Sequence, residues 1–455
     1  MSGLFSSLSQ ASRALAAQDY ALNVTGQNIA NLNTDGYARR TVDFQEVAPL
    51  AGGGVTAAGA LAQRDALLEA RIRQEYPSEQ QQGAIAGALG VVETSLGAAG
   101  SSIDDRLTQF FNAFSTLAQD PTSSVSRDGV ALQGQLLASA FNTMAANFSD
   151  AQRAADGQIR SGVEQINSLA QQISSLNTAI VSANGADVET LRDQQAVLLK
   201  QLSGLADIAV NNRDDGGADV SIGTGRALVV GGNAYTLGLG SAGISGLATI
   251  TSGSADITSE ITRGTVGGLL QVRDTLIPGY TNRLDQLAFG VQQQVNALHV
   301  AGYDSFGNSG QPFFTPLASA AGAASALAVD PAIAANSSLI AGSSTGAVGD
   351  NQTAKAIAAL RDAHGMSGGT ASLSDVWSQL VFRVGTDSQT AQAQQQTGEQ
   401  IVAQITSLRD QVSGVSLDEE SASMLKFQRA YQANAKLFST VDQTLQTLMA
   451  MVGVT

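Results

Sequence analysis

The sequence predicts an elongated, mainly α-helical chain with an inserted β domain, whose two ends lie together. Apolar residues recur every seven positions near both termini, which is typical of helices that pair as in a coiled coil. A third seven-residue series lies in the middle of the chain and indicates a central helical bundle. From residue 208 to residue 262 the period changes to short β-prone runs bounded by Gly or Asp, which predict a small outer β domain.

The composition bounds the size and excludes several classes of partner. A chain of 455 residues exceeds one ordinary core, so several structural units are expected. The formal net charge is −15 and no cluster of Lys or Arg reverses it locally, so neither nucleic acid nor a membrane surface is an expected partner. Cysteine is absent, which excludes disulfides, thiolate metal sites and a cysteine nucleophile.

The start of the chain bears on targeting. Residues 1–10 contain neither a basic stretch nor an apolar core, and nowhere do about 18 apolar residues follow one another. We therefore expect no membrane span and no cleavable signal peptide. If the chain leaves the cell, it needs an export route that recognises N-terminal segments without cleaving them.

The N-terminal series predicts a coiled-coil-like helix over residues 3–31. Its apolar stripe consists of Leu8, Leu15, Leu22 and Ile29. The helix should stop in the segment 31–37, because its Asn and Asp side chains favour local bonds to the backbone and Gly36 tolerates positive φ.

The C-terminal series mirrors the first one and offers it a partner helix. Ser416 and Glu419 have capping-box spacing and Gly414 can end the preceding helix, so the last helix should begin near Leu417. Its stripe consists of Leu417, Met424, Tyr431, Phe438 and Leu445.

Further helices are expected between the termini. Ile residues at seven-residue spacing mark one helix at 159–180, and the turn Asn184-Gly185 separates it from the next. Pro121 ends an earlier helix. The other expected helices cover about 104–118, 188–202, 268–298 and 388–412.

These elements divide the chain into four expected parts. The stretch 313–349 is rich in Ala, Ser and Gly without a period, so a loop-rich region is expected there. The parts are an inner terminal-helix domain (1–37 and 414–455), a helical bundle (38–205, 264–300 and 386–413), a small β domain (206–263) and a loop-rich segment with short helices (301–385).

A search for reactive groups favours structural interpretations. Only two histidines occur, His299 and His364, and neither has a metal-ligand partner at helical spacing. The acidic residues 418–420 are expected to complement the dipole of the first helical turn rather than to bind a metal. No catalytic residue, metal or cofactor is therefore predicted.

Three glycine-containing segments imitate ligand-binding loops but lack required residues. Gly223-Thr-Gly225 has Leu228 where a dinucleotide-binding loop needs glycine, so we expect a hairpin turn. The segment 304–308 resembles a calcium loop without its bidentate Glu, which indicates a plain turn. Gly52-Gly53-Gly54 lacks the Lys-Ser/Thr pair of a phosphate loop and is interpreted as a flexible linker.

Both ends of the chain resemble one family of proteins. The segment Ala30-Asn-Leu-Asn-Thr-Asp-Gly-Tyr-Ala-Arg-Arg40 resembles the signature that closes the first helix of flagellar rod, hook and hook-associated proteins, with Asp35 where that family usually has proline. Residues 413–434 resemble the terminal helix of the same superfamily. By this resemblance the motif residues Asn31, Thr34, Gly36 and Tyr37, together with both terminal stripes, are the expected assembly residues.

The middle of the chain distinguishes among members of that superfamily. Gly267-Gly-Leu-Leu-Gln-Val-Arg-Asp274 and the stretch 284–314 resemble the central pattern of FlgK-type hook-associated proteins. Where longer relatives carry a further β domain, this chain has only the Ala/Ser-rich stretch, so its outer region is expected to be reduced.

The resemblance implies a structural role at the hook-filament junction of the bacterial flagellum. It implies an extracellular ring of subunits that contacts the hook protein and a second, FlgL-type hook-associated protein, with an export chaperone that binds the C-terminal helix. The stripes should be disordered or partly folded before assembly, because they then have little to pack against.

Two alternative functions remain open from the sequence. A hook or distal-rod subunit would share both termini but would lack the central pattern. An extracellular enzyme would need convergent titratable groups, which the scarcity of His and the absence of Cys disfavour.

Overall fold

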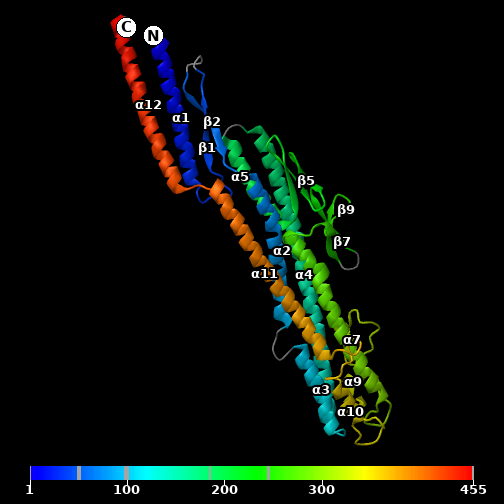
Figure 1. Cartoon of the computed structure of the whole chain (residues 1–455). Coiled ribbons are helices and arrows are strands. Elements are labelled where there is room, and N and C mark those ends of the chain that lie inside the picture. The colour runs from blue at the N-terminus through cyan, green and yellow to red at the C-terminus, as the bar shows by residue number, and fades with distance from the viewer. Residues whose placement is uncertain (1, 49–52, 97–101, 184–185, 243–245, 453–455) are drawn as a thin grey trace.

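The computed structural model describes residues 2–48, 53–96, 102–183, 186–242 and 246–452. The molecule is a long rod, and both termini lie at the same end of it (Figure 1), as predicted. Helices run along the rod and the small sheets lie against its flank. Among the described residues, no helix is long and apolar enough to cross a membrane.

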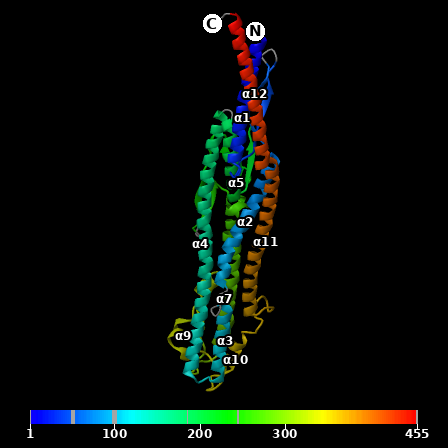
Figure 2. The same cartoon turned by 90° about the vertical axis from the view of Figure 1, so that its left-hand side faces the viewer.

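The two terminal helices pair side by side, as expected. Helix α1 covers Ser2–Ala30 and α12 covers Leu417–Val452. They extend together beyond the rest of the molecule in both views (Figures 1 and 2). The predicted start of the last helix at Leu417 is confirmed.

A β-hairpin that the sequence did not predict packs against α1. Strands β1 (Arg40–Glu46) and β2 (Val55–Ala62) pair antiparallel, from Arg40 opposite Ala62 to Glu46 opposite Val55. The flexible linker expected at 52–54 is wrong, because Gly53 and Gly54 belong to the hairpin connection, where the Val47 amide donates to the Gly54 carbonyl (2.8 Å). Gly52 lies outside the described residues. The small side chains of β2 give no alternating pattern that could have revealed the strand.

The bundle contains all the expected helices, several of them longer than predicted. The expected helix 104–118 is α3 (Ile103–Gln119), and the series at 159–180 belongs to α4 (Ser124–Ser182), whose four isoleucines are buried. The next two are α5 (Ala186–Leu205) and α7 (Ile277–Ala301), the latter preceded by α6 (Gly264–Gln271) and the π-helical turn η4 (Val272–Leu276). The turn predicted at Asn184-Gly185 lies outside the described residues.

Two bundle helices depart from the expectation. Helix α2 (Ala66–Leu96) was not predicted, because it contains Pro77 and its apolar residues do not gather on one clear face. Helix α11 (Leu373–Ser413) begins well before the expected residue 388. Its start is fixed by a capping box, in which the Asp375 amide donates to Ser372 Oγ (3.1 Å) and the Ser372 amide donates to Asp375 Oδ2 (2.9 Å).

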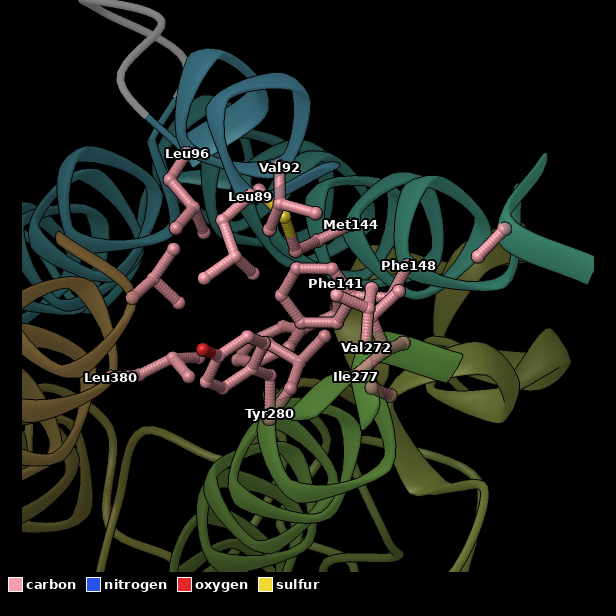
Figure 3. Close-up of a cluster of buried hydrophobic side chains, with 14 of the residues drawn as sticks. Leu89, Val92, Leu96, Phe141, Met144, Phe148, Val272, Ile277, Tyr280 and Leu380 are labelled. Carbon is pink, nitrogen blue, oxygen red and sulfur yellow. The ribbon is translucent and has the colours of Figure 1, made fainter. Parts of the chain in front are cut away.

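The bundle core is continuous, and it stops short of the terminal helices. Figure 3 shows apolar side chains of α2, α4, α7 and α11 meeting, among them Leu89, Phe141, Phe148 and Tyr280. Of the residues that the structure describes, none from α1 or α12 belongs to this cluster. The terminal pair therefore forms a separately packed unit with a thin core of its own.

The β domain lies along α4 (Figure 1) and forms two small antiparallel sheets. The predicted hairpin turn at 223–225 is confirmed, since it connects β4 to β5. The first sheet holds β3 (Ile208–Asn212), β4 (Ala218–Ile222), β5 (Arg226–Val230) and β6 (Asn233–Ala234). The second holds β7 (Leu237–Ala242), β8 (Leu247–Ser252) and β9 (Ala255–Asp256), and the 3-10 turn η3 (Thr258–Glu260) follows.

A buried arginine fixes the β domain to the bundle. Arg273 is 3% exposed, and its Nη1 donates to Asp156 Oδ1 of α4 and to the Ala248 carbonyl of β8, both at 2.7 Å. Asp156 Oδ1 also accepts from the Ala248 amide (2.7 Å). Burial raises the pKa of Asp156, but the bonds from Ala248, Arg160 and Arg273 together outweigh it and hold that pKa below its usual value. The segment 267–274, which marked the resemblance, thus orients one domain on another.

The distal end of the rod is loop-rich but ordered. The segment 302–372 contains only short helices among the described residues: α8 (Ala323–Ala326), α9 (Pro331–Ala335), the 3-10 turn η5 (Ser337–Leu339) and α10 (Gln352–Ala359). Phe313 and Phe314 anchor it, because both are fully buried against Phe110 of α3. The turn predicted at 304–308 is present, with Asp304 Oδ1 accepting from the amides of Phe306 and Asn308.

Candidate functional site

The candidate site is the joint where the terminal helices meet the bundle. Four predicted residues lie in the turn that ends α1, where the Thr34 amide donates to the Asn31 carbonyl (3.0 Å) and the Tyr37 amide to the Thr34 carbonyl (3.2 Å). Gly36 has φ +77°, and a Cβ there would lie 2.3 Å from Val197 Cγ2 of α5. Glycine is required at this position by both the backbone and the close approach of α5.

Asn28 is the centre of the joint, although the sequence did not indicate it. This residue is 1% exposed, and its Nδ2 donates to the Arg40 carbonyl (2.9 Å) and to Glu420 Oε2 (3.0 Å). Its Oδ1 accepts from Tyr37 Oη (2.8 Å) and from the Arg40 amide (3.0 Å). One amide side chain thus joins α1, the turn, β1 and α12.

Tyr37 remains protonated and serves as a donor in this network. Burial raises the pKa of Tyr37, and the nearby Arg40 guanidinium opposes the effect. The Arg40 guanidinium also lies over the Tyr37 ring, 5.0 Å from its centroid, so the two side chains hold each other in place.

Ion pairs connect the joint to α5. Asp193 accepts three hydrogen bonds. Arg40 Nη2 donates to its Oδ2 (3.0 Å), and Arg64 Nη2 (2.5 Å) and the Ala38 amide (3.3 Å) donate to its Oδ1. Arg64 further pairs with Glu189 (3.2 Å). The Arg40 and Asp193 side chains are buried, so removal of one charge leaves the other without compensation in a low dielectric.

A second set of ion pairs connects the joint to the start of α12. Arg39 Nε donates to Glu420 and Arg39 Nη1 to Glu419, both at 2.7 Å, and the Arg39 amide donates to the Ser413 carbonyl (2.8 Å). Glu420 is 2% exposed. The acidic residues expected to complement the helix dipole therefore also bind the segment that follows α1.

The predicted stripe of α1 is only partly covered in the structure. Leu8, Leu15, Leu22 and Ile29 are only half-buried. Among the described residues of α1, those that are buried are Ala11, Ala17, Ala21, Val24, Thr25 and Asn28, on a helix that packs against both α12 and the β1–β2 hairpin. The leucine stripe, meaning these three leucines and Ile29, is thus left partly uncovered.

The stripe of α12 shows the same partial coverage. Leu445 is buried, Met424 and Phe438 are half-buried, and Tyr431 and Leu417 are 39% and 51% exposed. A strict seven-residue spacing drifts around a straight helix of 3.6 residues per turn, so one stripe cannot remain in the seam along its whole length.

The histidines have structural environments. His299 is buried; its Nδ1 bonds the Gln311 carbonyl (2.5 Å) and its Nε2 accepts from the Ala341 amide (2.9 Å), which identifies a neutral ring with the proton on Nδ1. Burial lowers the pKa of His299 to about 4. His364 is exposed, and no group of three or more His, Cys, Asp or Glu within the described ranges could hold a metal ion.

Three family models match different parts of the chain. The model described as flagellar hook-associated protein FlgK helical domain matches residues 89–314. The termini match models shared with the rod: flagella basal body rod protein over 8–37, and flagellar basal body rod FlgEFG protein C-terminal over 410–451. The termini thus match models of flagellar rod proteins and the middle matches a model of FlgK, in agreement with the resemblance seen in the sequence.

Similar proteins cover nearly the whole chain. It is 29% identical to flagellar hook-associated protein 1 of Bacillus subtilis, over 100% of this chain and 99% of that protein. It is 24% identical to flagellar hook-associated protein 1 of Escherichia coli, over 97% of this chain and 99% of that protein. The solved structure of the flagellar hook junction protein FlgK from Burkholderia pseudomallei has a similar fold, with a TM-score of 0.66 at 18% identity, covering 75% of this chain and 100% of that one.

Proposed function

We propose that this chain, which belongs to the FlgK-type family of flagellar hook-associated proteins, is a structural subunit of the bacterial flagellum at the hook-filament junction. The match of the central helical domain over 89–314 carries this proposal, because both termini also match rod proteins and cannot make the distinction alone. The same match disfavours the alternative of a hook or distal-rod subunit.

The working surface is the uncovered apolar part of the terminal pair. The leucine stripe of α1 is half-buried in the structure. Complete burial of such a side chain from full exposure contributes roughly 1.5–3 kcal/mol, so completing the burial of a half-buried one contributes about half of that. Association of copies through these helices completes that burial. The function is thus packing, and we infer that no catalysis is involved.

The distribution of charge supports close association of the terminal helices. Helices α1 and α12 together carry a net charge of −1, whereas the whole chain carries −15. Copies that crowd through their terminal helices therefore repel each other little at the contact, and the charged remainder faces outward.

The joint gives this association a defined geometry. Its buried bonds among Asn28, Arg40, Asp193 and Glu420 hold the terminal pair at one angle to the bundle. We propose that this fixed angle lets a ring of subunits present one surface to the hook protein and another to a FlgL-type protein. The chain then acts outside the cell after export without a cleaved signal peptide, with a chaperone bound to α12 before assembly.

Deletion of the gene tests the junction assignment. The expected phenotype is bare hooks together with filament protein secreted into the medium, restored by the intact gene. A mutant that still grows complete filaments would remove the basis of this proposal.

A further inference from the structure

A groove beside the joint is large enough to receive part of another molecule. It has a volume of about 1220 Å³ and lies between the end of α1, the last turns of α4, and α5. Leu176, Ala179, Val197 and Leu198 give it an apolar part, and amide and hydroxyl side chains such as Gln171, Gln194 and Thr190 make up much of the rest. The motif residues Asn31, Thr34 and Tyr37 form part of its wall.

The groove also presents acidic groups that are not neutralised. Asp35 and Asp187 line it, both are exposed, and neither forms an ion pair within the part of the chain that the structure describes. In contrast, Asp193 is already paired with Arg40 and Arg64. The groove therefore fits a segment with an apolar side chain and cationic groups.

The outer face of α12 has this chemistry. Leu425, Arg429, Gln432 and Lys436 follow each other at spacings of four, three and four residues, which places them on one face of a helix. All four are exposed, with Leu425 at 56%, and their side chains form no hydrogen bond or ion pair with any other described residue. We call these four residues the outer stripe of α12.

The outer stripe and the groove lie on different sides of the molecule. Around the helix, the stripe is opposite the seam residues Glu420, Val441 and Leu445 that face α1. In Figure 1, α12 forms one edge of the molecule, and α4 and α5 lie beyond α1 on the other side. The stripe therefore cannot enter the groove of its own chain.

We propose that the outer stripe of α12 in one copy docks into the groove of a second copy. Leu425 packs on the apolar residues of the groove, Arg429 and Lys436 face Asp35 and Asp187, and Gln432 meets the amide side chains. Because donor and acceptor surfaces differ, the contact is head-to-tail and propagates from copy to copy, so it can close a ring. This inference rests on the proposed junction function and specifies how neighbouring subunits meet.

Cross-linking tests the contact directly, since the chain has no native cysteine. A variant with Asp187→Cys and Lys436→Cys is expressed as the sole copy, and isolated hook-filament complexes are treated with a short bismaleimide. A ladder of covalent multimers of this chain is expected, and each single variant should give at most a dimer. Pairing Asp187→Cys with Lys355→Cys, on α10 at the distal end, is the matched control and should give no ladder.

Charge reversal tests the proposed contact independently of cross-linking. Arg429→Glu with Lys436→Glu should lower the amount of the chain at hook ends about tenfold, and adding Asp35→Lys and Asp187→Lys should restore it. Arg283→Glu with Lys355→Glu changes the net charge equally at exposed sites elsewhere and should have little effect.

The outcomes separate this contact from the junction assignment itself. Junctions that contain the cysteine variant but yield only monomers, or only adducts with hook protein, would overturn the proposed contact while leaving the junction function intact. Failure of the charge swap to restore incorporation would also count against the contact. Absence of the unmodified chain from hook ends would instead contradict the function.

Discussion

Asp193→Ala should destabilise the joint severely. Asp193 compensates Arg40, whose side chain is 5% exposed, and Arg64, whose side chain is 23% exposed. Removing one partner of a buried ion pair typically costs about 3–5 kcal/mol, and the lower end is expected here because Arg64 retains Glu189. Gln194→Ala, at the exposed neighbouring position, should change stability by less than about 0.5 kcal/mol.

Urea unfolding of the free chain, followed by far-UV circular dichroism, measures this difference. A second variant, Asp193→Asn, retains the shape and one acceptor oxygen while it removes the charge, so its loss should lie between those of the two alanine variants. If Asp193→Ala and Gln194→Ala unfolded at the same urea concentration, the ion pairs would contribute nothing measurable and the account of the joint would be wrong.

Three further predictions concern the turn, the buried histidine and the free chain. Gly36→Ala should lower the free energy of unfolding by at least about 1–2 kcal/mol because of the left-handed backbone, and the clash with α5 adds to this loss. Gly26→Ala has open space around it inside α1 and should raise the free energy of unfolding by about 0.5–1 kcal/mol. Thermal unfolding of the two variants distinguishes these effects. His299 has its pKa lowered to about 4, so the unfolded chain takes up its proton first as pH falls. Its contribution is fully present above about pH 6.5 and about 3 kcal/mol is lost by about pH 4. His299→Gln should flatten this pH dependence of urea unfolding, and an unchanged slope would contradict the assignment. In the free chain, residues 1–33 and 417–452 should exchange amide hydrogens rapidly, because their shared core is thin; strong protection there would refute coupling of order to assembly.

The sequence revealed those parts of the fold that depend on local periodicity. The isoleucine series of α4 and the start of α12 at Leu417 were both predictable, since each reflects a repeat or a helix-breaking residue nearby. Helix α2 and the β1–β2 hairpin were not, because Pro77 and the small residues of β2 conceal the expected patterns. The early start of α11 had a signal in Ser372 and Asp375 that a search for capping boxes could have found.

The candidate site was only partly predictable. Asn31, Thr34, Gly36 and Tyr37 stand in one turn and share a local signature. Asn28 and Glu420 are separated by 392 positions, so their contact depends on the tertiary fold and leaves no local pattern. The terminal stripes indicated correctly that the helices pair, but their periodicity could not show that the buried residues of α1 include three alanines while the leucines stay half-buried.

The central claim is the place of this chain in the flagellum. Gold-labelled antibody against the chain, applied to intact isolated flagella and viewed by electron microscopy, tests it most directly. The account predicts a single narrow band of label between hook and filament. Label along the whole hook, or only at the rod, would contradict it.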